Sequence, residues 1–320
     1  MMLLYGKNGC SPCASVSVGG DQEKRIVHMN QEGDAWILLT AAEDGILAKM
    51  RQYGTPLKDM DVRINYGIKT GCNEAFIIDR AKYDELVAAD PKSAEVLKPL
   101  LRGRDIRRYG HAWAQKYLIG THNGMKAQNI PPVHIEDYPA VKAHLDQYWN
   151  SIEKRDDQGD TPYNLRNCAY WQDFEKPKIV WAETMRKHKT GSAGFPRFGY
   201  VDIPFYSDKT CFILIGIYLK FLLAILNSKA MRFFIHYTVA HLDTGGFNMQ
   251  KIYVDNFPIP QADRDVYEEL MSLVENTLNA RKHNKDTAEL ESKIDRIVYG
   301  LYHLTEDEIA LVEEKKKREI

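Results

Sequence analysis

The sequence predicts an α/β (α+β) protein in which a mixed sheet is followed by a C-terminal helical hairpin or bundle. Two observations lead to this prediction. Over residues 1–260, apolar runs of strand length alternate with helical segments, whereas after Pro260 apolar residues recur only at helical spacing. The 320 residues, 44% of them hydrophobic and 27% charged, suffice for one large domain or two ordinary ones. We therefore expect one domain over residues 1–260 and a helical element over 261–320.

Six apolar runs have the length, alternation or β-branched content of strands. They are RIVHM (25–29), AWILL (35–39), VRINY (62–66), KYLIG (116–120), KPKIVWAE (176–183) and TCFILIG (210–216). Helices are expected between the runs, where apolar residues recur at helical spacing. The expected helices run from Thr40 to Gly54, over 81–89 up to Pro91, over 141–153 and over 218–237.

Two amphipathic helices are predicted after Pro260. Their apolar stripes are Tyr267, Leu270, Met271, Val274 and Leu278 in the first helix, and Leu290, Ile294, Ile297, Val298 and Leu301 in the second. The polar link RKHNKD (281–286) predicts that the two helices pack antiparallel. Thr305 as N-cap and Glu308 three residues later begin a third helix. We expect these helices to form an appendage to the domain before them.

The stretch LLYGKNGCSPC (3–13) raises the question of a dithiol–disulfide oxidoreductase with Cys10 as its attacking thiolate. In thioredoxin-like domains the Cys-x-x-Cys pair opens a helix, whose N-terminus stabilises the thiolate. Here Cys13 is followed by ASVSVGG, a strand-and-turn pattern. No second Cys or His pair follows at zinc-finger spacing. We interpret Cys10 and Cys13 as incidental residues of a hairpin.

The sequence also indicates a compartment. Five scattered cysteines, an odd number, fit a reducing cytoplasm better than a disulfide framework. The longest apolar run, over 211–226, is interrupted by Lys220, and we therefore expect no membrane span. A cytoplasmic protein is the expectation.

Basic residues are concentrated in two segments, although the net charge is only −1. Residues 98–126 hold seven Lys or Arg against one acid, Asp105, and residues 185–200 hold four with no acid. Local cations, and not a basic pI, are what phosphate contacts require. Either segment alone could be an ordinary solvated surface. The two together favour a nucleic-acid ligand.

No catalytic constellation is visible. Adenine methyltransferases carry an Asp/Asn-Pro-Pro-Tyr/Phe loop, and the nearest match, NIPPV (129–133), has the wrong spacing and no aromatic residue. Walker, G-x-S-x-G and H-E-x-x-H motifs are absent. Acid and Lys groups such as Asp173, Glu175 and Lys178, or Glu183 and Lys187, could be forced into a metal nuclease site, but such groups are common by chance. We expect no catalytic residues, metal site or cofactor in this chain.

A family pattern begins at GIKTGCNEAFIID (67–79) and EVLKPLLRGRDIRRY (95–109). These segments resemble the TaqI-like C-terminal specificity, or target-recognition, domain of type IIG restriction–modification enzymes and related adenine-specific DNA methyltransferases. Further pieces follow in the family's order: YLIG (117–120), KPKIVWAE (176–183), YLKFLLAILNSK (218–229), FPIP (257–260) and IDRIVYGLYHLTEDEI (294–309). The resemblance covers roughly residues 36–312.

The resemblance implies an α/β recognition domain that grips one side of a DNA duplex and reads bases in the major groove. A preceding domain would hold S-adenosylmethionine and the flipped adenine, and the terminal helices would dock or space the recognition domain. The methyltransferase and nuclease parts are missing here. The chain therefore looks like an excised or separately encoded recognition portion, whose partners would be double-stranded DNA and a methyltransferase domain or subunit.

Candidate DNA contacts were chosen for charge, hydrogen-bonding capacity and glycine-bounded loops. They are Lys69, Thr70, Asn73, Arg102, Arg104, Arg107, Arg108, Lys126, Arg186, Lys187, Lys189 and Arg197. Asn73 is expected to cap its loop, and Asp105 to pair with Arg102 or Arg104. Residues 121–129 and 185–198 are the candidate base-reading loops. The alternatives are a small metal-dependent nuclease with an unrecognised site, a thiol oxidoreductase, or a protein–protein scaffold that acts through its helical tail.

Overall fold

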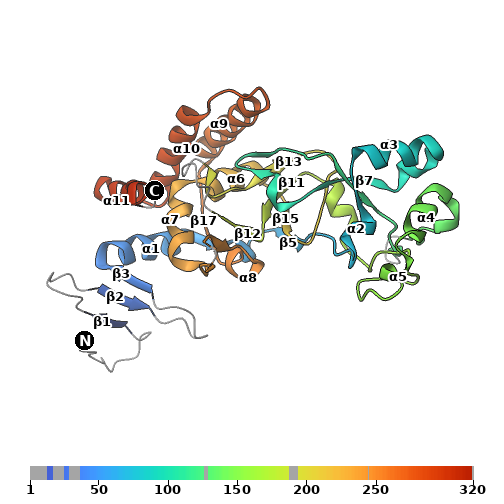
Figure 1. Ribbon diagram of the computed structural model, residues 1–320. Helices are drawn as coiled ribbons and strands as arrows, with labels where there is room; N and C mark the ends of the chain where they lie inside the picture. The colour runs from blue at the N-terminus through green and yellow to red at the C-terminus, as the bar shows by residue number, and fades with distance from the viewer. Residues whose placement is uncertain are drawn as a thin grey trace. The chain divides into compact units, whose positions relative to one another are not determined.

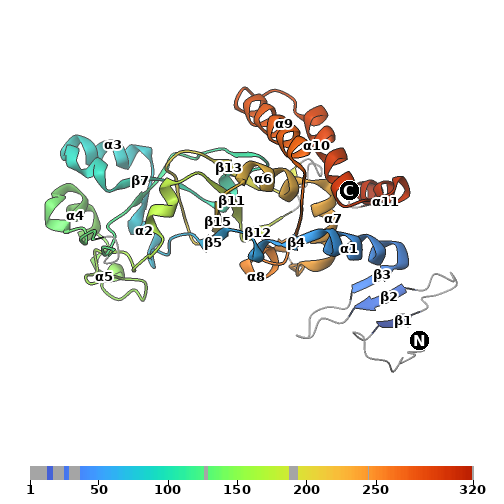
Figure 2. The same ribbon diagram turned by 180° about the vertical axis from the view of Figure 1, so that it is seen from behind.

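We describe a computed structural model of the chain over residues 13–16, 25–28, 37–125, 129–186, 194–243 and 245–318. The chain divides into two compact units. The central unit comprises Val62–Thr184 and Arg197–Leu219, and the terminal unit comprises Met1–Asp61, Met185–Pro196 and Lys220–Ile320. Figure 1 and Figure 2 show their elements from opposite sides.

Two four-stranded sheets form the frame of the central unit. The antiparallel sheet has the order β13 (Gly199–Val201), β11 (Lys178–Ala182), β15 (Cys211–Gly216) and β5 (Val62–Tyr66). The mixed sheet has the order β14 (Tyr206–Ser207), β7 (Leu97–Leu101), β10 (Lys116–Ile119) and β6 (Ile77–Ile78). In this sheet β14 and β7 pair in parallel, whereas β10 pairs antiparallel with both β7 and β6. The predicted α/β class with a mixed sheet is confirmed.

Short helices pack on the mixed sheet. They are α2 (Asn73–Phe76), α3 (Arg80–Ala89), α4 (Pro139–Asp146) and α5 (Trp149–Ile152). Leu86 of α3 and Val141 of α4 join Leu100 and Leu118 of the sheet in one buried apolar cluster. The single helix expected over 141–153 is instead two helices, because hydrogen bonds of the tighter i to i+3 type close the chain between them.

The terminal unit begins with an antiparallel sheet of β1 (Cys13–Val16), β2 (Arg25–His28) and β3 (Ile37–Thr40). The β1–β2 pair agrees with the expected hairpin, while Cys10 lies outside the described residues. Thr40 and Glu43 form a reciprocal capping box that begins α1 (Ala41–Tyr53). β4 (Gly54–Pro56) then pairs with β17 (Pro258–Pro260), so the two halves of this unit share a strand pair.

Helices make up most of the terminal unit. Besides α1, they are α6 (Leu219–Asn227), α7 (Lys229–Thr238), α8 (Lys251–Val254), α9 (Arg264–Lys282), α10 (Ala288–Leu301) and α11 (Glu306–Arg318). Two short strands, β12 (Thr184–Met185) and β16 (Phe247–Asn248), complete the element order. Ser228 divides the helix expected over 218–237, because its hydroxyl accepts from the Met231 amide at 3.0 Å and so caps α7. α9 packs against α10, as predicted.

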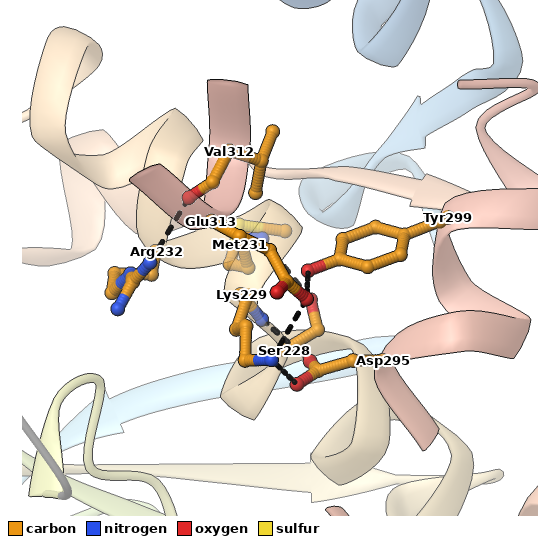
Figure 3. Close-up of polar contacts among 8 residues, drawn as sticks. All are labelled: Ser228, Lys229, Met231, Arg232, Asp295, Tyr299, Val312 and Glu313. Atoms are coloured by element: carbon orange, nitrogen blue, oxygen red, sulfur yellow. Dashed lines mark hydrogen bonds and ion pairs between the residues drawn. The ribbon is translucent and has the colours of Figure 1, made fainter. Parts of the chain in front are cut away.

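The C-terminal helices α10 and α11 are integral to the terminal unit. Asp295 of α10 accepts a hydrogen bond from the Lys229 amide at the start of α7 (2.7 Å), as Figure 3 shows. Arg232 of α7 donates to the Val312 carbonyl of α11 at 3.1 Å. α10 packs against α7, and α11 packs against α7 and α1, so residues 261–320 belong to the same compact unit as α1 and α7. The domain boundary expected after residue 260 stays a prediction. Within the described residues, no helix could span a membrane.

Candidate nucleic-acid interface

One end of the antiparallel sheet gathers the loops that carry exposed cations. The registers Ala182–Cys211 and Phe212–Tyr66 place the last residues of β11 and β5 beside the first residues of β15. β13 also begins at this end. Five basic side chains come from segments that leave or contact it, and we call them the basic end: Lys69, Arg104, Arg107 and Lys209, which are exposed, and Arg197, which is half-buried.

Arg104 is exposed in a 3₁₀ turn, Gly103–Asp105, that is fixed to the sheet. The Gly103 amide donates to the Thr210 hydroxyl at 3.1 Å, and the Asp105 carboxylate accepts from the Arg102 amide at 2.9 Å. A side chain at Gly103 would bring its Cβ to 3.2 Å from the same hydroxyl, so glycine allows the close approach. The sequence analysis expected Asp105 to pair with the side chain of Arg102 or Arg104. In the structure its carboxylate binds the backbone amide of Arg102.

This turn contains the buried carboxylate of Asp105, and the buried carboxylate of Asp208 lies close to it. Burial raises the pKa of Asp208, and the nearby charge of Asp105 raises it further. Burial also raises the pKa of Asp105, although Arg104 and Arg107 act in the opposite direction. Since both acids are withdrawn from solvent, the cations of the turn are what a ligand would meet.

The hairpin of β8 (Ile106–Arg107) and β9 (Gly110–His111) holds Arg107 near Arg197. The Tyr109 amide donates to the Phe198 carbonyl at 2.9 Å, which joins the hairpin to the segment before β13. Burial lowers the pKa of Arg197, and the positive charge of Arg107 lowers it further. Two guanidinium groups that repel each other in this way favour an anion beside them.

Lys69 is exposed in a loop whose other polar groups are engaged internally. The buried Thr70 hydroxyl donates to the Asn73 side-chain carbonyl at 2.7 Å, so the Asn73 side chain is bonded within its own loop. The Arg155 guanidinium donates to the carbonyls of Thr70 and, at 2.7 Å, Asp157. Thr70 therefore stabilises the loop, and its hydroxyl is not presented to a ligand in this structure.

Two further candidates, Arg102 and Arg108, do not present a whole guanidinium at the surface. Arg108 is buried, with its guanidinium carbon 5.2 Å from the centroid of the Tyr109 ring. The Nε and Nη2 atoms of Arg102 are buried and have no hydrogen-bond partner in the described part of the chain. In the sequence, Arg102 and Arg108 are as good candidates for DNA contacts as Arg104 and Arg107. Their lower exposure in the fold is what distinguishes them.

Most of the second predicted basic segment, Met185–Pro196, belongs to the terminal unit, whereas Arg197 belongs to the central unit. Arg186 is exposed directly after β12, and a Cβ at Gly246 would lie 2.9 Å from the Arg186 Cα. The remaining predicted lysines, Lys126, Lys187 and Lys189, lie outside the described residues.

The candidate base-reading loop over 121–129 is tied to a neighbouring loop where it is described. Asn123 donates to the side chains of Asp160 (2.9 Å) and Asn167 (3.0 Å). Its side-chain carbonyl accepts from the Asp160 amide at 2.7 Å. The amide nitrogen and the carbonyl oxygen of the Asn123 side chain therefore both take part in joining the two loops.

The residues considered for a metal nuclease have other partners. Asp173 pairs with Arg63 (3.3 Å) and Lys176 (2.9 Å), which fastens its turn to β5. Lys178 is buried and donates to three backbone carbonyls, those of Phe174, Lys176 and Ile203. In the described ranges, no group of three or more His, Cys, Asp or Glu side chains could hold a metal ion.

Comparisons with known proteins agree on one family. The family described as the TaqI-like C-terminal specificity domain matches residues 98–259, half of the chain. The type II methyltransferase M.BanIII of Aneurinibacillus aneurinilyticus is 23% identical over 288 residues, which cover 82% of this chain and 46% of that protein. The chain thus spans less than half the length of this relative.

Two solved structures share the fold. The type IIL restriction–modification enzyme MmeI, solved in complex with DNA, aligns with a TM-score of 0.62 at 14% identity, covering 99% of this chain and 45% of MmeI. The type IIG restriction endonuclease BpuSI aligns with a TM-score of 0.50 at 14% identity, over 81% of this chain and 33% of BpuSI. At these identities the likeness concerns the fold alone. Together with the match over residues 98–259, it confirms the resemblance carried by the sequence motifs, and the chain belongs to the family of TaqI-like C-terminal specificity domains.

Proposed function

We propose that this chain is the sequence-specific DNA recognition portion of a type IIG-like restriction–modification system with adenine-specific DNA methyltransferase activity. The chain would bind double-stranded DNA and would itself carry no catalysis. A methyltransferase domain or subunit would be its partner and would bind S-adenosylmethionine. M.BanIII is a methyltransferase and MmeI was solved with DNA, which supports this assignment.

The observation that carries the proposal is the basic end. Four antiparallel strands place its outer segments about 14 Å apart, since neighbouring strands lie roughly 4.8 Å from each other. The major groove of B-DNA is about 12 Å wide. Cations at this spacing can reach phosphates on both sides of the groove, while a side chain between them reaches base edges.

Enrichment of a random duplex pool on the isolated chain, at two salt concentrations, tests the proposal. We expect a motif of a few base pairs to be recovered. If all five cations of the basic end contact phosphates, log affinity should fall with log salt at a slope of about −4.5. Enrichment of no motif together with no retention of DNA at low salt would contradict the proposal.

Single substitutions then test the basic end itself. Arg104→Ala and Arg107→Ala should each lower affinity, and each should reduce the salt slope by about one if the side chain contacts a phosphate. Arg264→Ala is the matched control, because Arg264 is an exposed arginine on α9 of the terminal unit. It should leave affinity and slope unchanged.

A further inference from the structure

Tyr66, the last residue of the edge strand β5, is unusually open for an aromatic residue of a sheet. It exposes 46% of its surface. Tyr170 packs against the Tyr66 ring edge-on, with centroids 5.9 Å apart and an interplanar angle of 81°. The Lys69 ammonium lies over the ring, 5.5 Å from its centroid. The exposed Tyr66 ring thus contacts one aromatic neighbour, Tyr170, and one cation, Lys69.

The backbone around this pair is fixed. The Gly67 amide donates to the Cys211 carbonyl at 2.8 Å, directly after Tyr66. A Cβ at Gly67 would lie 1.9 Å from the Asp208 carbonyl oxygen, so only glycine can make this approach. Since Arg155 holds the Thr70 carbonyl on the far side of Lys69, both Tyr66 and Lys69 extend from a braced segment. The backbone of the site is therefore fixed before any ligand arrives, and the Lys69 side chain is the part that has to move.

We propose that Tyr66 is a stacking site for one unstacked nucleotide, whose base lies on the tyrosine ring and whose phosphate is bound by Lys69. The inference rests on the proposed function, because it requires nucleic acid at the basic end. Stacking of a base on an aromatic ring is a stronger contact than an exposed cation–π contact. A base can therefore displace the Lys69 ammonium from the ring, and the ammonium then moves to the phosphate of the same nucleotide.

The ligand is an unpaired nucleotide at a duplex end or junction. Bases inside a duplex already have both faces stacked on their neighbours, so their rings are not available to Tyr66. Stacking is tolerant of base identity, because every base has an aromatic face. Tyr66 would thus add affinity for an open strand without adding sequence preference.

Equilibrium binding of the whole chain to two hairpin duplexes tests the inference. One duplex has a blunt end, and the other carries a single-stranded overhang of about three nucleotides. We expect the overhang to raise affinity about five-fold or more. Tyr66→Leu should remove this gain, and Tyr66→Phe should keep it. Tyr53→Leu is the matched control, because Tyr53 is 40% exposed and its ring packs at a tilt against His303 in the terminal unit.

A crosslinking measurement gives an independent readout. With 5-iodouracil in the overhang, light should join the base to the peptide that contains Tyr66, and a crosslink confined to other peptides would overturn the inference. If the chain binds the blunt duplex and the overhang adds no affinity, or Tyr66→Leu retains the gain, the stacking site is wrong while the proposed function stands. If the chain binds neither duplex at low salt, both are overturned.

Discussion

The Tyr302 hydroxyl donates a hydrogen bond to the Pro258 carbonyl at 2.6 Å and thereby ties the end of α10 to β17. The Tyr302 side chain is fully buried. Burial raises the pKa of this phenol well above its usual range, so the hydroxyl keeps its proton and remains a donor. The C-terminal helices are therefore bonded to the strand that precedes them.

Tyr302→Phe should lower the free energy of unfolding by about 1–3 kcal/mol, because the Pro258 carbonyl then lacks a partner in a dry site. The volume of the core is retained, so no cavity contributes. Urea denaturation measures the effect, with Tyr53→Phe on the exposed face of α1 as the control. A loss below about 0.5 kcal/mol would mean that water reaches the carbonyl.

Removal of the helices after residue 260 should unfold the terminal unit. The truncated chain would expose the faces of α7 and α1 that α10 and α11 cover, and would leave buried Arg232 without its Val312 carbonyl. Limited proteolysis and the thermal unfolding midpoint report the outcome. Truncation after Glu314 is the control, because it retains Val312 and Glu313. If the chain truncated after residue 260 resists proteolysis as well as the full chain does, the helices that follow are an appendage.

Lys178 predicts a dependence of stability on pH. Burial lowers its pKa to about 8, against an ordinary value of 10.5. Below pH 8 both the folded and the unfolded chain hold the proton, and the contribution is constant. Between pH 8 and 10.5 the unfolded chain holds more protons than the folded chain, so the free energy of unfolding contributed by Lys178 rises with pH.

Lys178→Met should therefore be more destabilising at pH 9.5 than at pH 7. At pH 7 the substitution removes a costly buried charge but also three hydrogen bonds to carbonyls. At pH 9.5 the wild-type lysine is largely neutral and still donates two hydrogen bonds. Denaturant unfolding of both proteins at the two pH values decides the question. An equal difference at both values would show that Lys178 does not titrate in this window.

Arg155→Met should destabilise the central unit by about 2–4 kcal/mol and weaken DNA binding through the Lys69 loop. The substitution removes the guanidinium that binds the backbone carbonyls of Thr70, Asp157, Pro162 and Asn164, and so leaves these acceptors with fewer donors. Unfolding and DNA binding are measured on the same preparation. Arg166→Met is the matched control, because the Arg166 side chain is exposed and its guanidinium lies 3.4 Å from the Asp157 carboxylate. Equal effects of the two substitutions would argue against a bracing role for Arg155.

Patterns of local origin were sufficient for much of the fold. The capping residue Thr40, the break before Pro91 and the apolar stripes of α9 and α10 act within a few residues, and each element lies where its sequence indicates. The family could also be identified from the sequence, because its motifs are short and occur in a fixed order. The sequence analysis does not predict the helix breaks at Ser228 and between α4 and α5. Neither the Ser228 cap nor the i to i+3 hydrogen bonds after α4 interrupt the spacing of apolar residues.

The surface of the candidate interface depended on contacts between distant segments. The RGR motif (102–104), the basic segments and the motifs of the specificity domain can all be recognised in the sequence alone. Only the pairing of β15 with β5 and β11 brought Lys209, an isolated lysine between an acid and a threonine, to the same end as Lys69 and Arg104. Only tertiary packing buried Arg108 and Thr70 while leaving Arg104 exposed. The charge of a side chain follows from its residue type. Its exposure depends on which distant segments pack against it, and these tertiary contacts cannot be read from the local sequence.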